Sequence, residues 1–383
     1  MKSFSVNDIP AGSHFSEPLY IDDGFVLTAP EMPFTDELKK ILTEWRFDKV
    51  KSDGEPQESH SDSKANNKRE SYVLLNDNVK LIDAGAFCSD FKEFTNDIFL
   101  RLASKARVNY GIVAEKMRDV CEEVKTNRRF LLQVLKDINS EDDADFLAAH
   151  SVKSTIISII IGMYLKLPAH RIIELGVAAM LHEVGMLKLP PHIIMSKTEL
   201  SPQERNILMR HPIFGFELLK SLDFPMAVNA ASLEHHERED GGGYPYSLAG
   251  ENIGLYGKII AVACSYDAIT SKRPHKDARG AHEGITDLLR NEGRLYDETV
   301  IRALVFSLSI YPIGQHVQLS NGIKGQVVDV NPADPRFPIV QLLDEKNADS
   351  QNRIIKTSQM GIHIQIPLPD PAADPDDAPD TQK

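Results

Sequence analysis

Cysteine is scarce in this chain. Three of its 383 residues are cysteines, Cys88, Cys121 and Cys264, and they are widely spaced and odd in number. A disulfide-stabilised secreted domain needs paired cysteines, so this class is excluded, and such sparse thiols are typical of a reducing compartment. We therefore expect a cytoplasmic protein.

Positively charged residues are also relatively few. The 43 Lys and Arg residues are outnumbered by 56 Asp and Glu residues, which gives a formal net charge of −13. A protein that binds duplex nucleic acid needs a basic surface to neutralise phosphates, so we expect no such partner. A phosphate-bearing substrate would have to be held locally, by divalent ions and a few basic side chains.

Long apolar segments are missing as well. The longest apolar run, residues 156–165, contains Ser158 and Gly162, and it is shorter than the roughly 20 apolar residues that cross a bilayer. The N-terminal residues MKSFSVNDIPAGSHF contain no apolar stretch of the kind that a signal peptide has. We predict no membrane insertion.

The first 140 residues contain no chemical motif. Residues 1–50 predict a small α+β module, with a β-prone piece at 25–28 and a helix over 36–45, and we assign to it regulation or protein interaction. Residues 51–71 have almost no large apolar side chain and predict a disordered linker. Residues 72–140 carry apolar side chains at helical spacing, which predicts a helical connecting region for packing or dimerisation.

Residues 141–312 predict a succession of helices with readable start signals. The segment SPQE at 201–204 is a capping box that begins one helix, and Pro225 begins the next. A further helix over 255–270 places Cys264 and Asp267 on one face.

The pattern changes after residue 312. Residues 316–330 alternate around Asn321-Gly322, which predicts a β-hairpin within a small β extension at 313–366. The acidic, proline-rich tail at 367–383 is predicted to be disordered.

Five histidines stand at or near predicted helix ends. Neutral imidazole is the commonest protein ligand for a transition metal, and several imidazoles are needed to hold one ion. The adjacent pair His235-His236 precedes the glycine-rich loop GGGYP and can face one small centre. The other members of the set are His150, His182 and His211.

These segments resemble the HD-GYP family, metal-dependent phosphodiesterases of the HD superfamily that open cyclic di-GMP. The likeness covers about residues 141–312 and rests on His150 and on the ordered motifs LHEVGMLKLP, RHPIFG, HHEREDGGGYP and AVACSYDAITSKRPHK. It implies a mainly α protein: an HD-superfamily helical bundle between the α+β module and the β extension. It also implies two divalent ions, iron or manganese, on the ligands His150, His182, Glu183, His211, His235, His236 and residue 264.

Three positions depart from the family's pattern. Glu183 stands where the family has a bridging Asp, and it keeps the carboxylate at the end of a longer side chain. Cys264 replaces a metal-binding Asp, so it is either a soft sulfur ligand or a small buried apolar residue, and the first metal position is weakened. Met186 replaces a Lys that would donate charge or a proton to the phosphate, and Lys188 is a candidate substitute.

The substrate side of the family's site is better preserved. By resemblance, Tyr244 would stack on guanine or contact phosphate, while Arg273 and Lys276 would hold the phosphates of the dinucleotide. Asp267 would orient a base or a metal ligand.

Two functions therefore stay open. The first is a cyclic di-GMP phosphodiesterase of reduced activity, with Glu183 and Asp267 in the catalytic machinery. The second is a domain that binds metal and cyclic di-GMP without turnover and acts as a sensor or interaction module. Protein partners would bind through the N-terminal module, and a homodimer would form through residues 72–140.

Overall fold

The computed structural model divides into two compact units, Met1–Leu74 and Leu75–Lys383, which are described separately. Only the backbone of residues 63–77 is described. The described residues are 2–368 without 11–12, 18, 21–25, 29–33, 35–38, 41, 44–46, 58–62, 136–137, 139–145, 195, 197, 272–278, 332–333, 344–353 and 358–360.

The N-terminal unit is a small β-rich module. Its antiparallel sheet has the order β1-β5-β3-β4, and β2 pairs separately with β6. Buried Phe15, Leu19 and Phe34 contribute to its core. The strands are β1 (Lys2–Ser5), β2 (His14–Phe15), β3 (Leu19–Tyr20), β4 (Val26–Thr28), β5 (Lys49–Ser52) and β6 (Pro56–Gln57).

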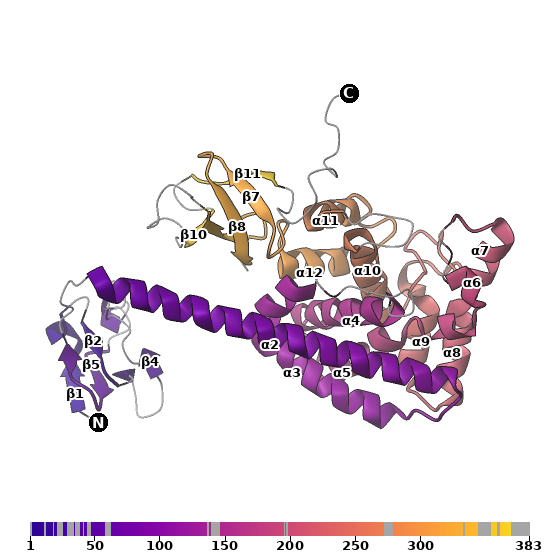
Figure 1. Cartoon of the computed structure of the whole chain (residues 1–383), viewed down its shortest axis with the longest axis horizontal. Helices are drawn as coiled ribbons and strands as arrows, with labels where there is room; N and C mark the ends of the chain where they lie inside the picture. The colour runs from indigo at the N-terminus through magenta and orange to yellow at the C-terminus, as the bar shows by residue number, and fades with distance from the viewer. Residues whose placement is uncertain are drawn as a thin grey trace. The chain divides into compact units, whose positions relative to one another are not determined.

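The second unit is a helical bundle followed by a sheet (Figure 1). The prediction of a mainly α, HD-type fold with small β-containing ends is confirmed. Its helices are α2 (Ser63–Ala103, which begins before this unit), α3 (Tyr110–Val134), α4 (Phe146–Tyr164), α5 (Ala169–Leu181), α6 (Pro191–Ile194), α7 (Pro202–Leu208), α8 (His211–Ser221), α9 (Met226–Glu234), α10 (Leu255–Thr270), α11 (Ala281–Arg290) and α12 (Glu298–Leu308), with 3-10 turns η3 (Val184–Lys188) and η4 (Gly250–Asn252).

Helix α4 is the central helix of the bundle. It is buried on all sides from Ala148 to Gly162 and packs against α5, α10 and α12. A helix that is apolar all round is stable only when neighbours cover it. By length and composition α4 could cross a membrane, but most of it is enclosed by the fold, as in the core helix of a bundle.

Local signals predicted several helix limits correctly. Ser201 and Glu204 form the expected reciprocal capping box at the start of α7, and α9 begins directly after Pro225. Helix α10 has the predicted limits. The helix that leads to His182 ends at Leu181, and Gly185 lies inside η3.

The β extension is a five-stranded antiparallel sheet in the order β10-β9-β8-β7-β11. The predicted hairpin around Asn321-Gly322 is confirmed, because β7 and β8 flank that turn. Its strands are β7 (His316–Leu319), β8 (Lys324–Asp329), β9 (Ile339–Leu342), β10 (Ile354–Lys356) and β11 (Ile364–Pro367).

The segment predicted to be a disordered linker, residues 51–71, is partly ordered. Its first residues complete β5 and form β6, and its last residues belong to α2 from Ser63 onward. Strand pairing includes both ends of the polar stretch KSDGEPQ, at residues 51–52 and 56–57, and this long-range interaction is not apparent from composition. Nearly all of the predicted disordered tail and most of the predicted helix over 36–45 lie outside the described residues.

Candidate metal centre

The five motif histidines arrive from four different helices. His150 lies in α4, His182 is the C-cap of α5, His211 is the first residue of α8, and His235 is the C-cap of α9 and precedes His236. Contacts of α5 with α4 and α9, and of α8 with α9, bring these segments together. Their convergence is therefore a product of helix packing.

Three of these histidines are oriented by the same local device. His182, His211 and His235 each place Nδ1 within 2.7–2.9 Å of the carbonyl oxygen three residues earlier. Carbonyls at a helix end lack a partner within the helix and are free to accept this hydrogen bond. Nδ1 therefore carries the hydrogen, and Nε2 presents a lone pair to the interior.

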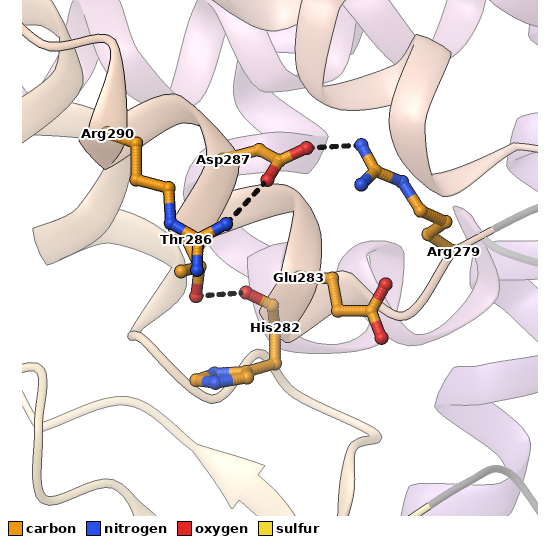
Figure 2. Close-up of a pocket in the computed structure, with 6 residues that line it drawn as sticks. All are labelled: Arg279, His282, Glu283, Thr286, Asp287 and Arg290. Atoms are coloured by element: carbon orange, nitrogen blue, oxygen red, sulfur yellow. Dashed lines mark hydrogen bonds and ion pairs between the residues drawn. The ribbon is translucent and has the colours of Figure 1, made fainter. Parts of the chain in front are cut away.

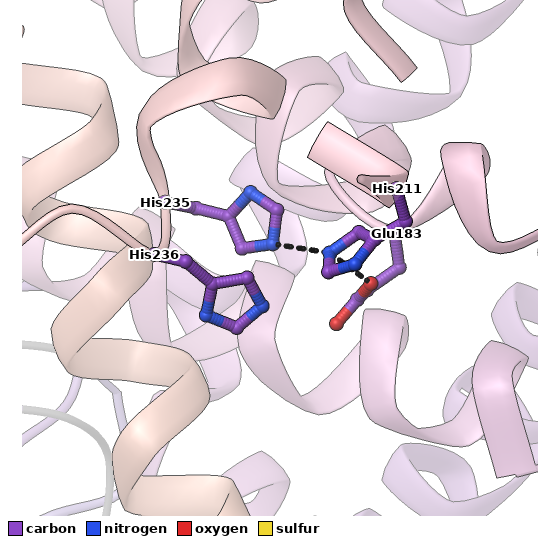
Figure 3. A group of neighbouring side chains, drawn as sticks. All are labelled: Glu183, His211, His235 and His236. Carbon is purple, nitrogen blue, oxygen red and sulfur yellow. Dashed lines mark hydrogen bonds and ion pairs between the residues drawn. The ribbon is translucent and has the colours of Figure 1, made fainter. Parts of the chain in front are cut away.

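Glu183, His211, His235 and His236 form the first group of donors, which we call the four-residue cluster (Figure 3). One ligand atom from each side chain lies within 4.8 Å of all the others. Nε2 of His211 is 3.2 Å from Nε2 of His235 and 3.1 Å from Oε2 of Glu183. Three nitrogen donors and a carboxylate suit a divalent transition ion.

The donors of the four-residue cluster fit a cation better than they fit one another. With Nδ1 of both His211 and His235 at backbone carbonyls, the two Nε2 lone pairs of the neutral rings face each other. Within the part of the chain that is described, the buried Oε2 of Glu183 accepts no hydrogen bond, despite its closeness to His211. Facing lone pairs repel, and a bound divalent ion converts that repulsion into attraction.

The charges of this cluster are those of metal ligands. Burial, reinforced by neighbouring imidazoles, lowers the pKa of His211 and brings the pKa of His235 and of His236 well below 6.5. Burial by itself would raise the pKa of Glu183, but His211 and His182 outweigh it and hold that pKa at about 2. Neutral imidazoles and an ionised carboxylate are the forms that bind metal.

His150, His182 and Cys264 form a second group, which we call the three-residue cluster. Sγ of Cys264 lies 3.1 Å from Nε2 of His182, and all three side chains are buried. Burial would raise the pKa of the Cys264 thiol, but His182 and His150 lower it to about 6. Cys264 thus lies beside two imidazoles.

Glu183 lies between the two clusters. Its Oε2 approaches His211 of the four-residue cluster, and its Oε1 is 3.8 Å from Nε2 of His182 in the three-residue cluster. One carboxylate can therefore reach toward both positions. This arrangement is what a bridging ligand requires.

Gly185 makes the close approach of Glu183 and His211 possible. A Cβ at this position would lie 1.9 Å from the backbone oxygen of His211 and 2.6 Å from the backbone nitrogen of Gly215. Only glycine lets η3 lie this close to α8. The motif HEVG thus carries a packing requirement together with two donors.

Asp267 contacts the three-residue cluster through the ring of His150. Its Oδ2 is 2.5 Å from Nδ1 of His150, and its Oδ1 accepts a hydrogen bond of 2.6 Å from Ser271. Lys153, which sequence reasoning missed, is buried with Nζ 3.9 Å from Oδ1 of Asp267 and 2.9 Å from Ser271. A lysine in an apolar helix three residues after His150 was the available signal.

The loop that carries Tyr244 is held against the four-residue cluster. The ring of Tyr244 stacks on His236 with centroids 4.6 Å apart, and its backbone N–H donates to the carbonyl of His236. Buried Glu237, also missed from the sequence, accepts hydrogen bonds of 2.8 and 2.9 Å from the backbone of Tyr246 and Leu248. The signal was an acidic residue directly after the paired histidines.

The remaining predicted site residues are less defined. Met186 is half-buried in η3, three residues after Glu183, and Lys188 is solvent-exposed. Arg273 and Lys276 lie outside the described residues.

A separate pocket lies along α11 and involves none of the predicted site residues (Figure 2). Asp287 forms ion pairs there with Arg279 and with Arg290, and the hydroxyl of Thr286 donates to the carbonyl of His282. Arg279, Asp287 and Arg290 are thus paired with one another, and the pocket contains no member of either cluster.

Comparison with known proteins agrees with the geometry. Residues 134–300 match the family model of the HD domain. The cyclic di-GMP phosphodiesterase PA4108 of Pseudomonas aeruginosa is 32% identical over 259 residues, which are 67% of this chain and 61% of that protein. The cyclic di-GMP phosphodiesterase PdeB of Borreliella burgdorferi is 26% identical over 225 residues, which are 57% of this chain and 59% of that protein.

The chain thus spans about three fifths of the length of these two relatives. The solved structure of Bd1817, an HDG"Y"P protein from Bdellovibrio bacteriovorus, is 16% identical with a TM-score of 0.49, over 79% of this chain and 97% of that one. The match over residues 134–300 shows that this part of the chain is an HD domain, and the ordered motifs within it are similar to those of the HD-GYP family.

Proposed function

We propose that the protein is a metal-dependent phosphodiesterase that hydrolyses the 3',5'-phosphodiester bonds of cyclic di-GMP, to linear dinucleotide or to GMP. The observation that carries the proposal is the pair of adjacent donor clusters with Glu183 between them. Relatives named cyclic di-GMP phosphodiesterases support the choice of substrate. Residues 141–312 would form the catalytic domain.

The proposed ligands are the members of both clusters. His211, His235 and His236 would hold one ion and His150 and His182 a second, with Glu183 shared and Cys264 completing the second set. Iron or manganese suits the nitrogen and carboxylate donors of the four-residue cluster. Bound divalent ions would supply a nucleophilic water and shield the charge that develops on the phosphate.

The other residues would bind and orient. Asp267 would fix the ring of His150 through Nδ1, and Tyr244 would present its ring to a base beside His236. Arg273 and Lys276 would hold the phosphates of the dinucleotide. The thioether of Met186 can neither donate a proton nor carry charge, so turnover should be about 10²- to 10⁴-fold below that of an enzyme with a lysine there.

The second candidate is a sensor that binds cyclic di-GMP without turning it over. Met186 favours it, because a half-buried thioether lies beside the carboxylate-bearing turn where a cation would assist the reaction. The N-terminal module would then transmit the bound state to a protein partner, and residues 72–140 would pair two copies. Both candidates fit a cytoplasmic protein.

One assay separates the candidates. Purified full-length protein, loaded with manganese or ferrous iron, is incubated with cyclic di-GMP, and the products are followed by chromatography. Metal-dependent formation of linear dinucleotide or GMP, lost in His211→Ala, supports the enzyme. Binding without product after long incubation supports the sensor, and neither binding nor product contradicts both.

A further inference from the structure

We propose that the three-residue cluster is a sulfur-containing site selective for a thiophilic divalent ion, Zn²⁺ first of all, so that the centre holds two unlike metals. This rests on the proposed function only in assuming that the two clusters bind ions.

The donor atoms of the two clusters differ in kind. The three-residue cluster offers two imidazole nitrogens and the sulfur of Cys264, whereas the four-residue cluster offers three imidazole nitrogens and a carboxylate. Thiolate is a soft ligand that favours zinc over manganese, which prefers oxygen. The position of Cys264, 3.1 Å from Nε2 of His182, puts sulfur among the ligands of one cluster only.

Both imidazoles of the three-residue cluster are prepared for metal by their other nitrogen. Nδ1 of His150 contacts Oδ2 of Asp267, and Nδ1 of His182 donates to the carbonyl of Ala179 at 2.7 Å. A carboxylate or carbonyl behind an imidazole fixes its tautomer and raises its basicity, as in zinc sites. Nε2 of each ring is thereby left as the donor.

A fourth ligand is within reach. Oε1 of Glu183 lies 3.8 Å from Nε2 of His182 and would complete two nitrogens, one sulfur and one oxygen. Zinc accepts four such ligands in a tetrahedron, with bonds of about 2.0 to 2.3 Å. Manganese, which prefers oxygen ligands, loses an oxygen donor where Cys264 stands and so gains less from this position.

The other cysteines provide a matched contrast. Cys88 and Cys121 are free thiols outside both clusters, in α2 and α3. Substituting a cysteine outside the clusters should leave a metal–thiolate signal unchanged, so the signal can be assigned to Cys264.

The test uses Co²⁺ as a spectroscopic probe in the metal-free full-length protein. Cobalt bound to thiolate absorbs strongly in the near ultraviolet, whereas cobalt bound to nitrogen and oxygen alone does not. We expect a band for one thiolate per chain in the wild type, retained in Cys121→Ser and in His211→Ala, and lost in Cys264→Ser and Cys264→Asp. Circular dichroism checks that each variant is folded.

A competition experiment tests selectivity. Cys264→Asp exchanges a soft sulfur donor for hard oxygen donors, which manganese prefers, so the ratio of zinc to manganese affinity should fall more than about 10-fold. Cobalt binding to the wild type without a thiolate band would overturn the proposal, even if no variant folds. So would a band that survives in folded Cys264→Ser, or an unchanged affinity ratio.

These outcomes do not depend on hydrolysis. A protein that shows the thiolate band but no product contradicts the enzyme and keeps the mixed-metal site. A protein that hydrolyses cyclic di-GMP without the band keeps the enzyme and contradicts this inference.

Discussion

Oδ2 of Asp267 lies 2.5 Å from Nδ1 of His150, although 117 positions separate the two residues in the chain. The pair joins α4 to α10 beneath the three-residue cluster, and Lys153 and Ser271 contact the same carboxylate. Asp267 thus orients a proposed ligand and is buried behind it.

Asp267→Asn keeps the shape of the side chain and removes its charge. Because the carboxylate fixes the tautomer of His150, metal affinity at the three-residue cluster should fall about 10- to 100-fold. Cobalt titration measures the loss, with Asp287→Asn on α11 as the matched control. An equal loss at the four-residue cluster would contradict a local role. Asp267→Asn also leaves the buried ammonium of Lys153 without its charged partner, which should lower the stability of the fold. The double variant Lys153→Met, Asp267→Asn removes that ammonium, so it should regain stability without regaining metal affinity.

Gly185→Ala should disturb both the fold and the metal centre. The added Cβ would meet the backbone oxygen of His211, which cannot rotate away as a side chain would. Overpacking of this kind costs about 1–3 kcal/mol or more. Thermal unfolding measures the loss. The control is Gly85→Ala in α2, where no atom lies within 4 Å of the new Cβ, and it should be neutral or stabilising by about 0.4–1 kcal/mol. A comparable loss of stability in both variants would contradict the proposed clash at Gly185.

Glu237→Ala should loosen the loop that carries Tyr244. The change leaves the backbone N–H groups of Tyr246 and Leu248 without their acceptor, at about 1–3 kcal/mol for each buried group. We expect about 1.4 kcal/mol of this cost to be lost from the binding free energy of cyclic di-GMP. The affinity should therefore fall about 10-fold. Calorimetry of ligand binding is the measurement, and Glu251→Ala at an exposed position is the control. Unaltered affinity would remove Glu237 from the binding site.

Met186→Lys should raise turnover. A lysine in η3 would supply the cation that the family pattern has at this position. Such a group typically contributes about 10²- to 10⁴-fold in rate, and we expect the turnover rate to rise at least about 10-fold. Product formation under single-turnover conditions measures the change. Met226→Lys, at an exposed position in α9, should have no effect. If Met186→Lys and the combined Met186→Lys, Cys264→Asp variant both leave the rate unchanged, the interpretation of these departures is wrong.

Several features follow from the sequence by itself, because their causes are local. The capping box at Ser201, the start of α9 after Pro225, the limits of α10 and the hairpin at Asn321-Gly322 depend on residues a few positions apart. The ordered histidine motifs likewise indicated the family without any knowledge of contacts.

Tertiary structure alone decided how the donors are divided and oriented. Cys264 meets His182 across 82 positions, and the three histidines that turn Nδ1 to a carbonyl do so because each lies at or directly beyond a helix end. Lys153 and Glu237 acquire their roles from partners that packing brings to them. Spacing along the chain fixes which residues share a helix face, whereas distances between helices depend on burial throughout the bundle.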